Sequence, residues 1–413
     1  LQSHQDMVCE KNKDAEFDFD NDAIQTYVDG DWLKAKGTTL GADDGIGIAM
    51  EMALLKANDI EHGPIECVFT RDEETGLTGA FEMKPGFMTG DYLINLDSED
   101  EGQLFVSCAG GVRTEATYTV DEEKLPEGFS TFNLVVKGLT GGHSGDDINK
   151  KRANANKLLV RFLWEQSEKT DLRLCDIQAG GLHNAIPREA HATVAVPTAY
   201  VATFGEELQA FVEKVRDEFS ATEPELTAVI EPVAAAPTCI CKEQAERLLK
   251  SLSVVHNGIF AMSQDLEGLV ETSSNLASVR KHGNQIVATT SQRSSVASNL
   301  EYMASVVRSA FELGGAKCVT NEGYPGWKMN PKSEILKVCV DSYKRLFGKE
   351  PLVRAIHAGL ECGLFSEKYP HLDMVSFGPT LRGVHSPDER LLIPTVQMVW
   401  DHLLDVLKNV PEK

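Results

Sequence analysis

Two adjacent acids, Asp43 and Asp44, stand between Gly41 and Gly45, just before the apolar run 46–55. Consecutive carboxylates at the start of a helix repel each other, and the helix N-terminus offsets only a fraction of one charge. A divalent cation would offset more. An acidic turn that merely caps the helix is the alternative, because aspartate is a common N-cap residue. The stretch alone leaves both interpretations open.

More acids and histidines follow predicted strands elsewhere in the chain. The alternation of strands and helices predicts a mostly parallel sheet, which gathers such residues along the carboxyl edge of its strands. In a strand, residues i and i+2 share a face, so His4 and Asp6 can act together. The other residues are Glu73 and Glu74 after a strand at 64–70, Asp97 after a strand at 91–97, and His385 after a strand at 372–377.

Two histidines and three carboxylates, one of them shared, form the ligand set expected for a pair of hydrolytic zinc ions. Glu73 beside Glu74 meets a second requirement of hydrolysis. If one glutamate binds metal, its neighbour can act as the general base toward water.

Composition restricts the class of protein. The 413 residues carry 40 basic and 63 acidic side chains, a formal charge of −23, which argues against a nucleic-acid or anionic-membrane partner. No apolar run approaches the roughly 20 residues of a transmembrane helix. The nine scattered cysteines predict reduced thiols in a cytoplasmic protein. The chain opens without methionine, as a truncated or processed N-terminus would.

The order of the predicted elements gives two domains. A mostly parallel α/β domain is predicted over 1–111 and 324–413, with a candidate edge strand at 104–107. The intervening residues 112–323 form an inserted α+β domain, since half-exposed alternating strands and amphipathic helices recur there. Two successive strand-and-helix units of similar size within the insertion suggest a duplication.

The motifs together resemble the M20 metallopeptidase family. They occur in the family's order along the chain: His4-Gln-Asp6, Gly41-Ala-Asp-Asp-Gly45, Thr70-x-x-Glu-Glu-x-Gly76, Asp97 and His385-Ser-Pro. Further segments resemble the aminoacyl-histidine (Xaa-His, cytosolic non-specific) dipeptidases: Gly141-Gly-His-Ser-Gly145 and His357-Ala-Gly-Leu-Glu-Cys-Gly363 are among them. Two features depart from the pattern. The several tens of residues that precede the His-x-Asp motif in the family are absent, and Asp44 stands where these dipeptidases more often have asparagine.

The resemblance implies roles for the residues of the first domain. Asp43 would bridge two zinc ions, with His4 and Asp97 completing one site and Glu74 and His385 the other. Asp6 would orient His4. Glu73 would take a proton from the attacking water shared by the metals and deliver it to the leaving amine. The family also implies a cis peptide bond between Asp43 and Asp44, with Asp44 not itself a ligand.

The resemblance makes the inserted domain a lid and a dimerisation domain. His143 would polarise the scissile carbonyl as an oxyanion donor, often in the partner subunit's site. Arg293 is the candidate for the substrate's free carboxylate, and Asn184 is a further candidate substrate contact. An exposed loop histidine and a surface salt bridge are the alternatives for His143 and Arg293.

The predicted protein is therefore a cytoplasmic, homodimeric di-zinc dipeptidase acting on dipeptides with free termini, such as Xaa-His. Cobalt or manganese could replace zinc. An M20-type deacylase of N-acyl amino acids and a non-catalytic binding member of the fold are the alternatives. Short peptides are the expected partners, with no nucleic acid and no membrane.

Overall fold

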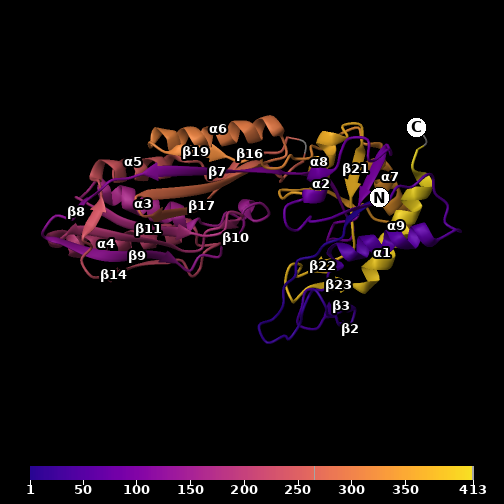
Figure 1. The fold of residues 1–413 in the computed structure, drawn as a ribbon, viewed down its shortest axis with the longest axis horizontal. Coiled ribbons are helices and arrows are strands. Elements are labelled where there is room, and N and C mark those ends of the chain that lie inside the picture. Colours follow the sequence, from indigo (N-terminus) through magenta and orange to yellow (C-terminus); the bar gives the residue numbers. More distant parts are fainter. Residues whose placement is uncertain (265, 412–413) are drawn as a thin grey trace. The chain divides into compact units, whose positions relative to one another are not determined.

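A computed structural model of the chain describes residues 1–264 and 266–411 (Figure 1). The chain forms two compact units: unit 1 comprises Leu1–Cys108 and Pro325–Lys413, and unit 2 comprises Ala109–Tyr324. The sequence placed the corresponding divisions at 111/112 and 323/324. Among the described residues, no helix combines the length and the apolar character needed to cross a membrane.

The main sheet of unit 1 is mostly parallel, as the sequence predicts. Strand β1 pairs in parallel with β4 and with β5, β5 pairs in parallel with β21, and only the short contact between β21 and β6 is antiparallel in this part of the described chain. In order across the sheet the strands are β20 (Leu352–Ile356), β6 (Gln103–Cys108), β21 (Asp373–Ser376), β5 (Tyr92–Asn95), β1 (Gln2–His4) and β4 (Val68–Thr70).

The strand expected at the edge lies inside the sheet instead. Strand β6 is covered by β20, which pairs with it in parallel over Leu352 to Ile356. The edge prediction was therefore wrong, because the partner comes from a segment some 250 positions later in the chain, which local pattern cannot reveal. The strand predicted at 64–70 is shorter, since only Val68–Thr70 pairs with β1.

Helix α7 of unit 1 begins at a residue whose side chain caps it. In α7, Ser333 caps the N-terminus by accepting a hydrogen bond from the N–H of Leu336 at 3.0 Å, and Ile335, Cys339 and Tyr343 form the buried side. Helix α7 packs against α9 and β21. The unit's helices are α1 (Ala42–Lys56), α2 (Thr78–Glu82), α7 (Glu334–Phe347), α8 (Glu361–Lys368) and α9 (Ile393–Asn409).

A second, four-stranded antiparallel sheet in unit 1 joins the early and late parts of the sequence. Its inner strands pair Lys34 with Arg390 and Trp32 with Leu392. The turn between its last two strands carries His385. The strands, in order across this sheet, are β2 (Thr26–Asp29), β3 (Trp32–Ala35), β23 (Arg390–Leu392) and β22 (Leu381–Arg382).

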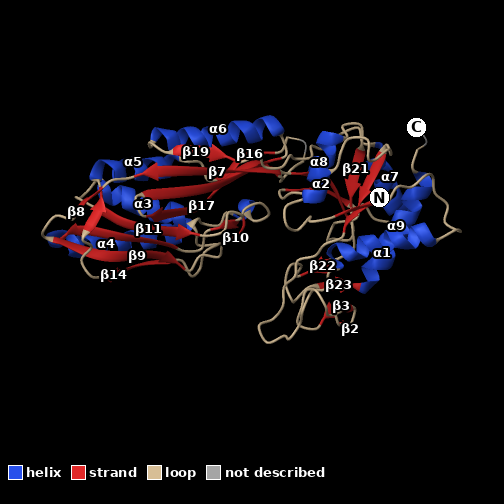
Figure 2. Cartoon of the chain, viewed as in Figure 1, coloured by secondary structure: helices blue, strands red, loops and turns tan. Residues whose placement is uncertain are grey.

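Unit 2 is built on one large antiparallel sheet, and its helices are seen in blue against the red strands in Figure 2. The order across the sheet is β14 (Thr227–Pro232), β9 (Phe129–Lys137), β13 (Ala190–Pro197), β11 (Arg173–Gly180), β17 (Val270–His282), β18 (Gln285–Ser294), β7 (Gly110–Thr119) and β19 (Lys317–Thr320), with β16 (Gly258–Met262) also paired to β17. Two small ribbons pair β10 (Gly142–His143) with β12 (Ala185–Ile186) and β8 (Glu122–Lys124) with β15 (Thr238–Ile240).

The core of unit 2 lies on one face of this sheet. Alternate residues of β9, namely Phe132, Leu134 and Val136, are buried in it, as period-2 geometry requires. Helical residues from all four long helices join the same cluster. Those helices are α3 (Ala155–Ser167), α4 (Val201–Glu218), α5 (Lys242–Val254) and α6 (Ala297–Leu313), and two short 3-10 turns lie at Ile148–Lys150 and Thr198–Tyr200.

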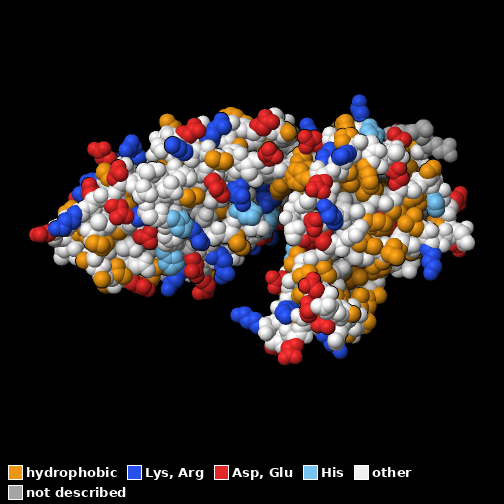
Figure 3. All heavy atoms as spheres, in the orientation of Figure 1, with side chains coloured by type: hydrophobic (Ala, Val, Ile, Leu, Met, Phe, Trp, Pro, Cys, Tyr) orange, Lys and Arg blue, Asp and Glu red, His pale blue; other side chains and the backbone are white. Residues whose placement is uncertain are grey.

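The strands of the two units suggested by the sequence belong to one sheet, and β7, from the start of the first unit, pairs with β18 of the second. Strands β14, β9, β13 and β11 lie in one half, and β17, β18, β7 and β19 in the other. A duplication stays a prediction. On the face shown in Figure 3, acidic and basic side chains are interspersed over unit 2.

Candidate active site

The register of the parallel strands brings the predicted residues of unit 1 to one edge. His4, the last residue of β1, pairs with Thr70 at the end of β4, and Gln2 pairs with Asn95 at the end of β5. Glu73 and Glu74 come three and four residues after Thr70, and Asp97 comes two residues after Asn95. Residues far apart in the sequence therefore meet because three strands end side by side.

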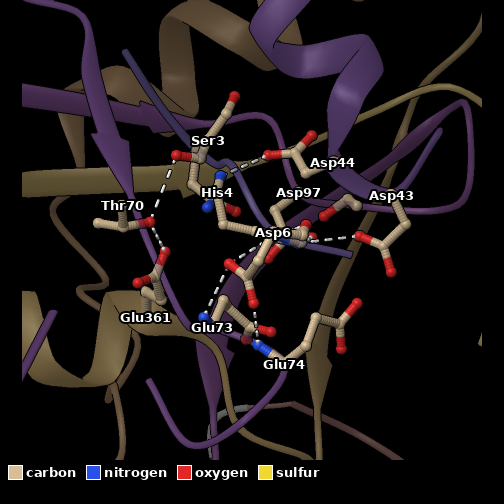
Figure 4. A network of polar contacts seen from close by, with 12 residues as sticks. Ser3, His4, Asp6, Asp43, Asp44, Thr70, Glu73, Glu74, Asp97 and Glu361 are labelled. Atoms are coloured by element: carbon tan, nitrogen blue, oxygen red, sulfur yellow. Dashed lines mark hydrogen bonds and ion pairs between the residues drawn. The ribbon is translucent and has the colours of Figure 1, made fainter. Parts of the chain in front are cut away.

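Asp43 lies between two histidines and directs a different oxygen at each. Its Oδ1 is 3.2 Å from His4 Nε2, and its Oδ2 is 3.3 Å from His385 Nε2. Asp97 Oδ1 lies 3.7 Å from His4 Nε2, and Glu74 Oε2 lies 3.1 Å from His385 Nε2. Figure 4 shows His4, Asp43, Asp97 and Glu74 converging. The arrangement is two half-sites that share one carboxylate.

Burial and mutual contact alter the protonation of these groups. Burial lowers the pKa of His4, but its hydrogen bonds to Asp43 and Asp97 outweigh that effect and raise it. Hydrogen bonds to Asp43 and Glu74 raise the pKa of His385 to about 10. Burial raises the pKa of Asp97 well above its usual range. The two histidine shifts reflect the surrounding carboxylates, whereas the Asp97 shift reflects burial.

The donor set fits divalent cations. Ligand atoms of His4, Asp43 and Glu74 all lie within 4.8 Å of one another. The Oε1 atom of Glu74 is buried and has no hydrogen-bond partner among the described residues. A buried carboxylate oxygen without a partner costs free energy unless a cation or donor meets it. Imidazole and carboxylate are ligands that zinc accepts.

Asp6 acts on this site differently from the sequence-based expectation. The ring of His4 is held through Nδ1 by the backbone carbonyl of Asp6 at 2.9 Å, whereas the Asp6 carboxylate lies farther away, at 3.7 Å. The carboxylate instead accepts the N–H of Glu73 and of Glu74, each at 3.0 Å. The main chain of Asp6 therefore orients His4, whereas the Asp6 carboxylate fixes the Glu73-Glu74 turn.

The surroundings of Glu73 raise the pKa of its carboxyl. Burial raises its pKa, His4 lowers it, and the carboxylates of Glu74, Glu361 and Asp43 raise it again, to about 8. A carboxylate with a pKa near neutrality can both take and return a proton.

Asp44 points away from the candidate ligands. Its carboxylate is buried and accepts the N–H of His4 at 3.3 Å (Figure 4). A Cβ at Gly47 would stand 2.4 Å from Asp44 Oδ1 and from Ser3 Oγ, which explains why glycine occupies that position. The Asp43–Asp44 peptide bond is cis, as expected.

A buried row of hydrogen-bonded polar side chains lies beneath the site and was not predicted from the sequence. Asn95 Nδ2 donates to Gln2 Oε1 at 2.6 Å, and Gln2 Nε2 and Thr70 Oγ1 each donate to Glu361 Oε2 at 2.6 Å. Ser376 continues the row with a bond to Asn95 Oδ1 at 2.5 Å. The only signal for it in the sequence is that Gln2 and Asn95 each stand two residues before a candidate ligand.

Sequence analysis also missed Glu389, four residues after His385. Its carboxylate accepts backbone N–H groups from Leu40 to Asp43. No local pattern connects segments separated by more than 340 positions.

The predicted residues of unit 2 form a separate cluster. His143 on β10 pairs with Ala185 on β12, and the N–H of Ser144 donates to the carbonyl of Asn184 at 2.8 Å. Arg293 on β18 donates from Nη1 to the Tyr324 hydroxyl at 2.9 Å, and its Nη2 lies 3.4 Å from His143 Nε2. Arg293 is 7% exposed, so the alternative of a surface salt bridge is wrong. Its Nε is buried with no hydrogen-bond partner in the described chain.

Comparison with known proteins extends this picture to the whole chain. Residues 1–409 match the model of peptidase family M20/M25/M40. The chain is 43% identical over 413 residues to the cytosol non-specific dipeptidase of Escherichia coli (strain K12), covering 100% of this chain and 85% of that protein.

Solved structures give a similar result. The crystal structure of aminoacylhistidine dipeptidase from Vibrio alginolyticus matches with a TM-score of 0.93 and 44% identity, covering 100% of this chain and 84% of that one. Aminopeptidase PepT from Bacillus cereus ATCC 10987 matches with a TM-score of 0.55 and 15% identity over 98% of this chain and 79% of its own, a likeness of fold alone.

Proposed function

The chain belongs to peptidase family M20/M25/M40, and we propose that it is a metallo-dipeptidase that hydrolyses dipeptides with free termini, such as Xaa-His. The observation that carries the proposal is Asp43, whose two oxygens face His4 and His385 at 3.2 and 3.3 Å. Similarity to two dipeptidases over the full chain supports the substrate class.

Two zinc ions, which cobalt or manganese could replace, would be held by the five candidate ligands. Asp43 would bridge them, with His4 and Asp97 on one side and Glu74 and His385 on the other. When bound, the zinc ions would supply Lewis-acid chemistry that acidifies water and polarises the carbonyl.

The chain's own residues then move the protons. Glu73 accepts a proton from the attacking water and gives it to the nitrogen of the leaving amine. Asp6 holds the backbone of Glu73 and Glu74 by two hydrogen bonds, which fixes the base beside the ligand. The return of the proton to the amine requires that the pKa of Glu73, about 8, lies near neutrality.

His143, Arg293 and Asn184 of unit 2 are the proposed substrate contacts. His143 would donate to the developing oxyanion of the scissile carbonyl. Arg293 would bind the free carboxylate of the substrate, because a planar guanidinium forms paired hydrogen bonds with a carboxylate. Its buried Nε, without a partner in the described residues, supports a role in binding an anion.

We also propose that the chain forms a homodimer through unit 2. Strand β16 pairs with β17 alone among the described strands, and it exposes Ile259, Phe260 and Met262. The Phe260 ring lies 6.0 Å from that of Tyr302 on α6, which is 57% exposed. Apolar edge strands are usually covered.

The molar mass measured by light scattering tests this surface. Phe260→Lys should have a lower mass than the unaltered chain, and an unchanged mass would contradict the proposed dimer.

A cytoplasmic location is proposed on two grounds. All nine cysteines are free thiols, which suits a reducing compartment. The Escherichia coli relative is named for the cytosol.

The function is tested by substrate choice. Zinc-loaded protein should hydrolyse alanyl-histidine and leave N-acetyl-histidine intact. Hydrolysis of the N-acetyl amino acid alone would favour the deacylase alternative. Absence of both activities, together with absence of bound metal, would favour a binding role.

A further inference from the structure

The helix that carries Asp43 begins without a side-chain cap of its own. Helix α1 spans Ala42–Lys56, but Asp43 and Asp44 have non-helical backbone angles, with ψ of 106° and 32°, and Gly41 before them has a left-handed φ of 71°. The N–H groups from Leu40 to Asp43 therefore lie in an irregular segment ahead of the regular helix. Backbone N–H groups taken out of water in such a segment need an acceptor from another part of the chain.

Glu389 supplies that acceptor with both oxygens. Oε2 accepts the N–H of Leu40 at 2.7 Å and of Gly41 at 3.0 Å, and Oε1 accepts the N–H of Ala42 at 2.8 Å and of Asp43 at 3.3 Å. The side chain is 3% exposed. Four converging N–H donors offset the buried negative charge of this carboxylate.

The same residue lies at the base of the turn that presents His385. Between β22 and β23 the Ser386 hydroxyl donates to the carbonyl of Gly383 at 2.7 Å, and the N–H of Glu389 donates to the carbonyl of Ser386 at 3.0 Å. His385 itself has a φ of 62°. Both hydrogen bonds lie within the turn that connects His385 to Glu389.

Beside the carboxylate, an apolar cluster joins the two segments: Leu40 and Ala42 pack with Leu381 and Leu391. Such contacts hold the segments together but do not direct a main chain, because apolar attraction is non-directional. The four hydrogen bonds of Glu389 are directional, and one of them is donated by the N–H of Asp43 itself.

We propose that Glu389 is a positioning residue that fixes the Asp43 main chain relative to the His385 turn, so that Asp43 and His385 bind one of the two cations together. The inference rests on the metal pair of the proposed function. The His4 side has supports of its own: His4 is 1% exposed, its ring is held by the carbonyl of Asp6, and its Nε2 lies 3.2 Å from Asp43 Oδ1, so Asp43 keeps its place beside His4 without Glu389. His385 has a half-exposed side chain on a turn, so its position relative to Asp43 depends on Glu389.

The test is a stepwise metal titration of the full chain after removal of metal. Glu389→Gln keeps the size of the side chain but turns an amide NH2 toward two backbone N–H groups. Co2+ binding, followed by absorption spectroscopy and calorimetry, should show an unchanged first equivalent and a second equivalent weakened by about 10- to 100-fold. Asp388→Asn removes a neighbouring but exposed carboxylate and should titrate like the unaltered chain.

Other outcomes overturn the inference. Two unchanged equivalents in Glu389→Gln, with or without a lower melting temperature, would mean that Glu389 is only structural. Equal weakening of both equivalents would contradict the selective role. If Glu389→Gln does not fold, Glu389→Asp decides by the same criteria, because it keeps the charge and shortens the reach. An unaltered chain that binds fewer than two ions would refute the proposed metal pair, and this inference with it.

Discussion

The two units differ in what lies behind their functional residues. In unit 1 a buried polar row, from Ser376 through Asn95 and Gln2 to Glu361, runs beneath the candidate ligands. In unit 2 the sheet is backed by one continuous apolar cluster that includes Leu134, Leu159 and Phe311. In unit 1 each polar side chain of the row is aligned by hydrogen bonds to its neighbours, so a substitution at one residue disturbs the positions of the others. In the second case the apolar core fixes the scaffold independently of the cluster around His143.

The units also differ in the sign of the charge they gather. The unit 1 site concentrates Asp43, Asp97, Glu73 and Glu74. In the unit 2 cluster Arg293 and His143 lie together, with one acid, Asp146, 3.3 Å from His143 Nδ1. Acids without enough counter-charge select cations, and a buried guanidinium selects anions. Unit 1 should therefore fail through loss of metal, and unit 2 through loss of substrate affinity.

The largest effect is expected at the shared ligand. Asp43→Asn removes the negative charge that both half-sites use, so both ions should be lost. Turnover should then fall toward the uncatalysed rate, on the order of 10⁶-fold or more. Metal analysis and a dipeptide assay check this result. Asp59→Asn, an exposed change in the same unit, is the control; retention of two tightly bound ions by Asp43→Asn would refute the bridge.

A smaller effect in the same unit should separate the base from the ligands. Glu73→Gln keeps the volume of the side chain and the backbone bond to Asp6, but the amide cannot accept a proton. Turnover should fall by about 10²- to 10⁴-fold while two ions stay bound. If the metal is lost together with the activity, Glu73 is a ligand and not the base.

Much of unit 1 could be predicted from the sequence, for a physical reason. His4, Glu73, Glu74 and Asp97 follow strands, and parallel strands end at one edge, so local pattern carries three-dimensional information. The part that failed is non-local. The pairing of β20 outside β6 and the bonds of Glu389 to 40–43 join distant segments through main-chain donors, which any sequence provides.

Asp6 shows a subtler limit. The spacing of His4 and Asp6 correctly predicted their proximity, but the spacing could not say which atom of Asp6 would meet the ring. The outcome depends on the Glu73 and Glu74 N–H groups, which compete for the carboxylate and bind it at 3.0 Å. In unit 2 the roles of His143, Arg293 and Asn184 came from resemblance alone, and they stay predictions.

A substitution at Arg293 tests whether unit 2 binds the negative charge of the substrate. Arg293→Lys keeps the positive charge but loses the planar fork, so kcat/KM for a dipeptide should fall by about 10- to 100-fold, equivalent to about 1.4–2.7 kcal/mol. Most of the loss should be in KM, with both ions still bound. A dipeptide amide lacks the carboxylate and should show little difference between the two proteins. Arg308→Lys, exposed on α6, is the control, and equal losses on dipeptide and amide would contradict carboxylate recognition.

The smallest effect on function is expected from the scaffold of unit 2. Lys157 on α3 donates to the carbonyls of Leu252 and Ser253 at 2.8 Å and of Val255 at 2.9 Å, at the C-terminal end of α5. Lys157→Met leaves these acceptors without a cationic donor, which should lower the free energy of unfolding by about 1–3 kcal/mol in urea. Lys250→Met, an exposed change on α5, should cost less than about 1 kcal/mol. Because the proposed metal ligands belong to unit 1, both variants should bind two ions with unchanged affinity. Weaker metal binding in Lys157→Met would mean that the two units are coupled, and the separation of roles between them would fail.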